Sequence, residues 1–123
     1  MPAILVVDDD ELMCELLGVH LRDAGYTASA CLDGAEAIHS VLAQKPDLVL
    51  LDLNMPYIDG FELLKAFKGD VLTSAIPVIV LTSRTDMNSL ERVMAMGAAD
   101  YLTKPIRVEQ LIESVARVLG QGA

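Results

Sequence analysis

The sequence has 123 residues, of which 53% are hydrophobic, and we expect one domain over residues 1–123 with one buried core. Its 18 Asp and Glu residues outnumber nine Lys and Arg residues, giving a net charge of −9, so we do not expect this domain to bind nucleic acid directly. No apolar run approaches the roughly 20 residues of a membrane span. No basic leader follows Met1, so we expect a cytoplasmic protein without a membrane anchor.

Apolar runs alternate with amphipathic segments from the beginning of the chain. The run at 3–7 predicts a buried strand, and two interleaved apolar repeats predict a helix over 12–21 with one broad apolar side. A mixed run at 26–31 predicts a strand nearer a sheet edge, a helical repeat follows at 35–42, and another buried strand is predicted at 47–51. The two repeats of the first helix are Leu12, Leu16 and Val19, and Met13, Leu17 and Leu21.

The same alternation continues through the second half of the chain. Apolar spacing at 61–67 and at 87–94 predicts two helices, one on each side of an almost wholly apolar strand at 76–81. A mixed run at 100–103 predicts the last strand, and a strong repeat over 108–119 predicts the last helix. Repeated strand–helix units favour parallel pairing with right-handed crossovers. The predicted fold is therefore a doubly wound α/β fold, a five-stranded parallel sheet with helices on both faces.

Acidic residues stand where two of the predicted strands end, and ligands of doubly wound sheets bind beyond the carboxyl ends of strands. Asp8 and Asp9 follow the first strand and Asp52 follows the third, so we expect three carboxylates at one edge. Capping of the next helix accounts for Asp10, but crowded carboxylates at strand ends repel each other, and a divalent cation relieves that repulsion. Because the ligands are oxygens and the two His residues stand apart, we expect Mg²⁺ rather than Zn²⁺.

Asp52 is the candidate nucleophile at this edge. A carboxylate attacks phosphorus to give an aspartyl phosphate, and a metal ion orients it and offsets the growing negative charge. Lys104 precedes Pro105, and a cis bond at this turn would aim its ammonium group into the acidic cluster; the alternative is an ordinary exposed lysine. Thr82 ends the fourth strand, where its hydroxyl either donates to a phosphoryl oxygen or serves only the strand.

Four segments of the chain resemble the receiver domains of two-component response regulators, a family that includes the bacterial chemotaxis receiver. The resemblance covers the whole chain and keeps the segments in the order and spacing of the family. It implies a flavodoxin-like receiver fold with strand order 2-1-3-4-5. The segments are Val6 to Asp9, Leu51 to Gly60, Leu81 to Ser83 and Gly97 to Pro105.

The resemblance also implies a chemistry. A histidine kinase or phosphotransfer protein would supply a phosphoryl group to Asp52 in a Mg²⁺-dependent reaction. The chain would be a signalling phosphoacceptor that catalyses only its own phosphorylation and dephosphorylation. The implied metal ligands are Asp9, Asp52 and the backbone carbonyl of Asn54, with Asp8 acting through water, and the implied phosphoryl contacts are Thr82 and Lys104.

A conformational switch is implied as well. Movement of Thr82 toward the phosphate would leave space for Tyr101 to turn inward, although the position also suits a plain core aromatic. The face formed by the fourth helix, fifth strand and fifth helix would then change and meet a downstream effector protein or a linked output domain. Pairing of two copies through this face stays open. Asn54 and Arg84 are expected to flank the phosphoryl group.

Two other classes share part of the pattern. Phosphatases of the haloacid dehalogenase class also use a strand-end Asp nucleophile and Mg²⁺, but they need a second Asp two residues later as acid and base. Here that position is Asn54, which does not transfer a proton at neutral pH. Receiver-like interaction modules that are not phosphorylated usually lack an acidic or Lys position, whereas this chain has all of them.

Overall fold

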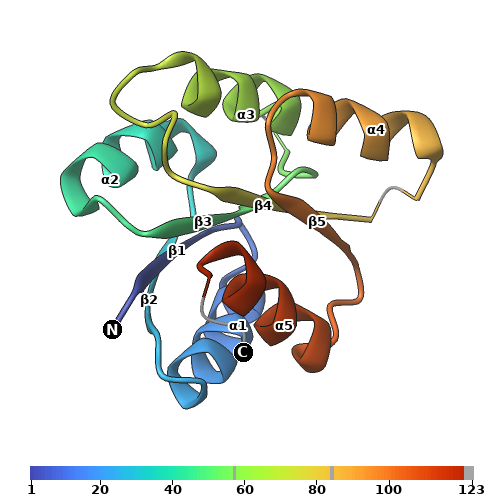
Figure 1. Cartoon of the computed structure of the whole chain (residues 1–123). Coiled ribbons are helices and arrows are strands. Elements are labelled where there is room, and N and C mark those ends of the chain that lie inside the picture. The colour runs from blue at the N-terminus through green and yellow to red at the C-terminus, as the bar shows by residue number, and fades with distance from the viewer. Residues whose placement is uncertain (57, 84, 121–123) are drawn as a thin grey trace.

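A computed structural model describes residues 1–56, 58–83 and 85–120, and within these ranges a five-stranded parallel sheet lies between two layers of helices (Figure 1). The strand order is β2-β1-β3-β4-β5, as the resemblance to receiver domains implies. Helices α2, α3 and α4 cover one face, and α1 and α5 cover the other. The strands are β1 (Ala3–Val7), β2 (Thr27–Cys31), β3 (Leu48–Asp52), β4 (Val78–Thr82) and β5 (Asp100–Thr103). The helices are α1 (Glu11–Asp23), the short 3₁₀ helix η1 (Gly34–Glu36), α2 (Ala37–Gln44), α3 (Gly60–Gly69), α4 (Met87–Ala95) and α5 (Val108–Val118).

The central strands are apolar throughout because both faces of the sheet are covered. Successive side chains of a strand point to opposite faces. In β1, Ile4 and Val6 pack into the core cluster beneath α1 and α5, whereas Leu5 and Val7 pack into the cluster beneath α2, α3 and α4. All five residues of β3 and of β4 are buried. The near-continuous apolar runs of the sequence therefore correspond to strands that are covered on both sides.

Helix α1 differs from its prediction in one respect. Leu12, Leu16 and Val19 were expected to share the core-facing side, but their side chains are 65%, 51% and 50% exposed. At about 100° per residue, these three positions lie on the side opposite to the buried positions, so the two apolar repeats do not form one broad side. The buried positions of α1 are Cys14, Leu17, Gly18 and Leu21.

Two polar residues are the last residues of central strands. Asp52 ends β3 and pairs in register with Leu81, and Thr82 ends β4 and pairs in register with Thr103 of β5. Their backbones are thus held by the sheet rather than by a loop.

The helices within the described ranges are too short or too polar for any of them to cross a membrane.

Candidate metal centre

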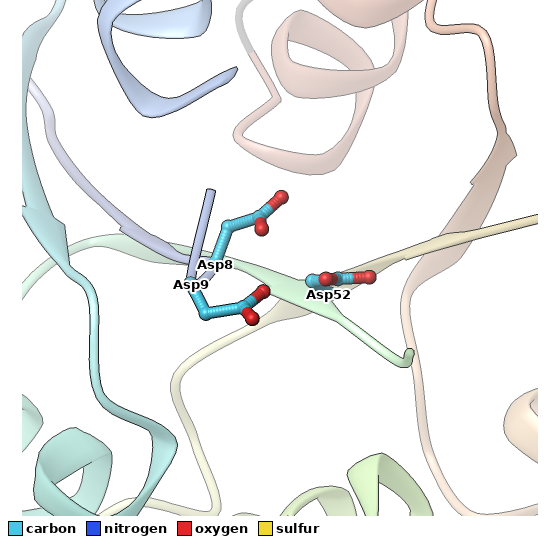
Figure 2. A group of neighbouring side chains, drawn as sticks. All are labelled: Asp8, Asp9 and Asp52. Atoms are coloured by element: carbon cyan, nitrogen blue, oxygen red, sulfur yellow. The ribbon is translucent and has the colours of Figure 1, made fainter. Parts of the chain in front are cut away.

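Three carboxylates gather at the carboxyl edge of the sheet (Figure 2). Asp8 and Asp9 directly follow β1, and Asp52 ends the adjacent strand β3. One oxygen atom from each carboxylate lies within 4.8 Å of the other two. The predicted acidic cluster is therefore present, and it arises because parallel neighbouring strands end at the same edge.

Asp8 is the most constrained member of the cluster. It is fully buried, and its Oδ1 accepts a hydrogen bond of 3.0 Å from the backbone N–H of Asp10. Its Oδ2 has no hydrogen-bond partner and is within ion-pair distance of the Lys104 Nζ, at 3.7 Å. Buried polar atoms in proteins nearly always have a partner, so this oxygen is in position to be satisfied by a cation or its bound water.

Burial raises the pKa of Asp8 from 3.8 to about 6. The backbone N–H of Asp10 acts against this by favouring the charged carboxylate, the negative charge of Asp52 raises the pKa further, and the Lys104 ammonium lowers it. Asp8 is thus a carboxylate whose negative charge is poorly compensated by the protein. A bound cation would compensate it.

The donor set fits a hard divalent cation. Among the residues that the structure describes, Asp8, Asp9 and Asp52 form the group of His, Cys, Asp or Glu side chains close enough to share an ion, and all of their donor atoms are oxygens. Carboxylate oxygens are the ligands that Mg²⁺, Ca²⁺ and Mn²⁺ prefer, whereas Zn²⁺ sites are usually built from Cys sulphur and His nitrogen. The residues therefore fit the metal site that the sequence predicted.

Lys104 lies beside the carboxylates, as expected. Its Nζ is 3.2 Å from Oδ1 of Asp52, and its side chain is 24% exposed. The Lys104–Pro105 bond is cis. The backbone N–H of Lys104 donates to the carbonyl of Thr82 at 2.8 Å, which ties the end of β5 to the end of β4. The ammonium group is thus held at the cluster and is not a freely exposed surface charge.

Asp52 is oriented by two donors that contact one of its carboxylate oxygens. It is 2% exposed, and its Oδ1 accepts from the backbone N–H of Asn54 at 3.0 Å as well as from Lys104.

Helix α3 begins immediately beside the end of β3. A Cβ atom on Gly60 would lie 2.5 Å from the carbonyl oxygen of Leu53, so α3 can start here only with glycine as its first residue.

Asn54 makes side-chain contacts that the sequence did not predict. Its side-chain Oδ1 accepts hydrogen bonds from the backbone N–H of Ser83 at 3.0 Å, from the Ser83 hydroxyl at 3.2 Å and from the Thr82 hydroxyl at 3.5 Å. Ser83 belongs to a segment that resembles the receiver family, but no role was predicted for it. No sequence signal identifies such contacts, because they depend on how one side chain crosses between two strand ends.

Tyr101 lies in β5, opposite Val80, and is half-buried against the core cluster of α2, α3 and α4. It lies two residues before the end of β5 and is not part of the acidic cluster.

The residue before Tyr101, Asp100, anchors α5 to the strand by accepting from Ser114 Oγ at 2.7 Å and from Arg117 at 2.5 Å. Arg84, which was expected to flank the site, lies outside the described residues.

Comparison of the sequence with known families gives a match to the family described as the response regulator receiver domain, over residues 4–116. Among curated proteins, the DNA-binding dual master transcriptional regulator RpaA of Synechocystis sp. is 36% identical over 119 residues, which is 97% of this chain and 49% of the relative. The DNA-binding response regulator MtrA of Mycobacterium tuberculosis is 37% identical over 112 residues, which is 91% of this chain and 48% of the relative. The chain thus spans about half the length of these curated relatives.

Solved structures show the same likeness over nearly full length. A putative response regulator from Chloroflexus aurantiacus superposes with a TM-score of 0.90 at 34% identity, covering 97% of this chain and 98% of that chain. The chemotaxis protein CheY4 of Vibrio cholerae gives a TM-score of 0.88 at 32% identity, covering 96% and 98%. The fold is therefore the same as that of a solved response regulator and a solved chemotaxis protein.

Proposed function

The chain belongs to the response regulator receiver family of two-component systems, and on that premise we propose that its Asp52 accepts a phosphoryl group from a histidine kinase or phosphotransfer protein. Receivers are signalling phosphoacceptors rather than enzymes, which sets the phosphatase alternative aside. The observation that carries the proposal is the placement of Asp52: a buried carboxylate with an ammonium group at 3.2 Å and two further carboxylates within 4.8 Å. The proposed receiver comprises residues 1–123.

The metal of this site is Mg²⁺ in the proposal. Asp9, Asp52 and the backbone carbonyl of Asn54 would ligate it directly, and Asp8 would hold it through water. The oxygen-only donor set and the unpartnered Oδ2 of Asp8 support this assignment. When bound, the ion supplies positive charge that offsets the negative charge of the transferring phosphoryl group.

Phosphoryl transfer requires little covalent chemistry from the protein beyond the nucleophile. A carboxylate oxygen of Asp52 forms a bond to phosphorus while the phosphorus–nitrogen bond of the donor phosphohistidine breaks, and the electron pair returns to the imidazole. Lys104 and the Asn54 N–H orient the carboxylate through their contacts with Oδ1. After transfer, the Lys104 ammonium and the Thr82 hydroxyl hold phosphoryl oxygens.

The proposed output follows from the position of Thr82 and Tyr101 on adjacent strands. A phosphoryl dianion at the rim draws Thr82 toward it, Tyr101 turns inward, and the surface formed by α4, β5 and α5 changes. This surface would meet a downstream effector protein or a covalently linked output domain, or pair two copies of the chain. The relatives named as DNA-binding are about twice as long as this chain, which supports an output region separate from the receiver.

Intact mass measurement tests the phosphoacceptor role directly. Incubation with acetyl phosphate and Mg²⁺ should add the mass of one phosphoryl group to the wild-type chain and none to Asp52→Asn. Asp23→Asn, an exposed position at the end of α1, is the matched control and should gain the same mass as wild type. A wild type that gains no mass would identify an interaction module without phosphorylation, and equal gain by Asp52→Asn would place the reaction elsewhere.

A further inference from the structure

One neutral oxygen at the rim receives three hydrogen-bond donors. The Asn54 Oδ1 accepts from the backbone N–H and the hydroxyl of Ser83, at 3.0 and 3.2 Å, and from the hydroxyl of Thr82, at 3.5 Å. Thr82 is 1% exposed and is fixed at the end of β4. The backbone N–H of Ser83 can only donate, so the atom facing it must be the oxygen of the carboxamide rather than its nitrogen.

Three donors are more than a carboxamide oxygen needs. Such an oxygen has two lone pairs, and hydrogen bonds to a charged acceptor are shorter and stronger than those to a neutral one. The two hydroxyl contacts, at 3.2 and 3.5 Å, are longer than an ordinary O–H···O hydrogen bond, so the amide oxygen satisfies these donors only weakly. The donors at the end of β4 therefore suit an oxygen carrying more negative charge than the amide does.

The same asparagine is tied to the nucleophile. Its backbone N–H donates to the Asp52 Oδ1 at 3.0 Å, and the adjacent Leu53 N–H donates to the Leu81 carbonyl at 2.8 Å. The side chain of Asn54 thus runs from the carboxylate of β3 to the donors of β4. An oxygen atom on a phosphorylated Asp52 would have to compete with it for those donors.

Resting on the proposed function, we infer that the Asn54 carboxamide stands in for a phosphoryl oxygen in the resting receiver and must be displaced when the phosphoryl group arrives. Asn54 is in this respect a positioning residue: it keeps Thr82 and Ser83 engaged while Asp52 is unmodified. The consequence is a lower affinity of the resting site for a phosphoryl group. Removal of the side chain should therefore tighten binding, whereas a side chain with a purely structural role would not.

Beryllium fluoride, which mimics a phosphoryl group on a carboxylate, provides the test. Its dissociation constant is measured at saturating Mg²⁺ for wild type, Asn54→Ala and Asn88→Ala, the last being the other asparagine of the chain and exposed on α4. We expect Asn54→Ala to bind about fivefold more tightly than wild type, the equivalent of one neutral hydrogen bond no longer displaced. Ser83→Ala removes a hydroxyl donor that would pass to the phosphoryl group, so it should bind beryllium fluoride more weakly than wild type, and Asn88→Ala should match wild type.

NMR spectroscopy tests whether the change in beryllium fluoride affinity involves the backbone N–H of Ser83. The amide resonance of Ser83 in the metal-loaded resting protein should shift in Asn54→Ala, and thermal unfolding should show that each variant is folded. Unchanged or weaker beryllium fluoride binding by folded Asn54→Ala would overturn the inference while leaving the phosphoacceptor role intact. Wild-type protein that neither binds beryllium fluoride nor gains phosphoryl mass would instead overturn the proposed function.

Discussion

Burial of the Asp8 carboxylate opposes folding of the metal-free protein once the group is charged. Its raised pKa of about 6, against 3.8 for an unburied carboxyl, means that the folded metal-free protein holds the proton of Asp8 more tightly than the unfolded chain does. Both states are protonated below the unfolded pKa, so no penalty exists there. As pH rises through the folded pKa, the buried charge increasingly opposes folding. Above it, the penalty is fully present.

Removal of the Asp8 charge should therefore stabilise the metal-free protein at neutral pH. Near neutral pH and in the presence of a chelator, Asp8→Asn should raise the free energy of unfolding by up to about 3 kcal/mol, since each unit of pKa shift corresponds to about 1.4 kcal/mol. The same change should weaken Mg²⁺ binding. Urea unfolding from acid to neutral pH measures the effect, and the gain over wild type should grow with pH.

Asp9→Asn is the matched control for that experiment, because Asp9 belongs to the same cluster but is exposed. Its effect on the free energy of unfolding should stay within about 0.5 kcal/mol, as for most surface substitutions. A stability gain of Asp8→Asn that shrinks as pH rises would contradict the account of Asp8.

A metal ion bound at the acidic cluster would compete with Lys104 for the same carboxylates. Its ammonium lies 3.2 Å from Asp52 and 3.7 Å from Asp8, so it already offsets part of their charge. Lys104→Met should therefore tighten Mg²⁺ binding, on the order of tenfold for a partly exposed cation at these distances. Calorimetric titration measures the dissociation constant. Lys65→Met, at an exposed position of α3, should leave the constant unchanged, and weaker binding by Lys104→Met would show that Lys104 supports the metal site instead.

At the scale of elements, the start of α3 is fixed by close packing against the end of β3. A Cβ atom on Gly60 would lie 2.5 Å from the Leu53 carbonyl oxygen and 2.6 Å from its Cα, both of which are backbone atoms that cannot rotate away. The Leu53 backbone lies between Asp52 and Asn54. Displacement of α3 would therefore move both the proposed nucleophile, Asp52, and the proposed carbonyl ligand, Asn54.

Gly60→Ala should accordingly lower the free energy of unfolding by about 1 to 3 kcal/mol, the usual cost of overpacking, and weaken Mg²⁺ binding as well. Gly69→Ala, at the other end of the same helix, is the control, because a Cβ atom added there would have no neighbouring atom within 4 Å. That variant should be neutral or more stable by up to about 1 kcal/mol. Urea unfolding compares the two, and equal effects would rule out a packing role for Gly60.

Strand-based features could be predicted from the sequence, whereas features that depend on side-chain direction could not. Asp8, Asp52 and Thr82 were placed correctly because a residue at the end of a buried parallel strand has little freedom of position. In α1, spacings of three and four residues occur on both sides of the helix, so periodicity did not show that Leu16 is exposed. The contact from Asn54 to β4 was also beyond prediction, because it depends on a side-chain rotamer.

At the scale of the whole molecule, the two core clusters keep the strand ends in register. Residues of β1, β3 and β4 contribute alternately to both clusters, so the carboxylates at the rim stand on a backbone packed from both sides. The sheet hence resists the repulsion among Asp8, Asp9 and Asp52 rather than spreading to relieve it. The Lys104 ammonium offsets part of this repulsion, and a cation bound at the cluster would offset more of it.

Magnesium should therefore stabilise the whole fold by binding at this one place. A ligand present at 100 times its dissociation constant adds about 2.7 kcal/mol to the free energy of unfolding when only the folded state binds it. A chain of net charge −9 is also stabilised by general screening, so the comparison needs NaCl at matched ionic strength. Thermal unfolding should show a larger rise in Tm with MgCl₂ than with NaCl for wild type, and no difference between the two salts for Asp52→Asn. An equal rise with both salts in wild type would mean that the acidic edge holds no specific metal ion.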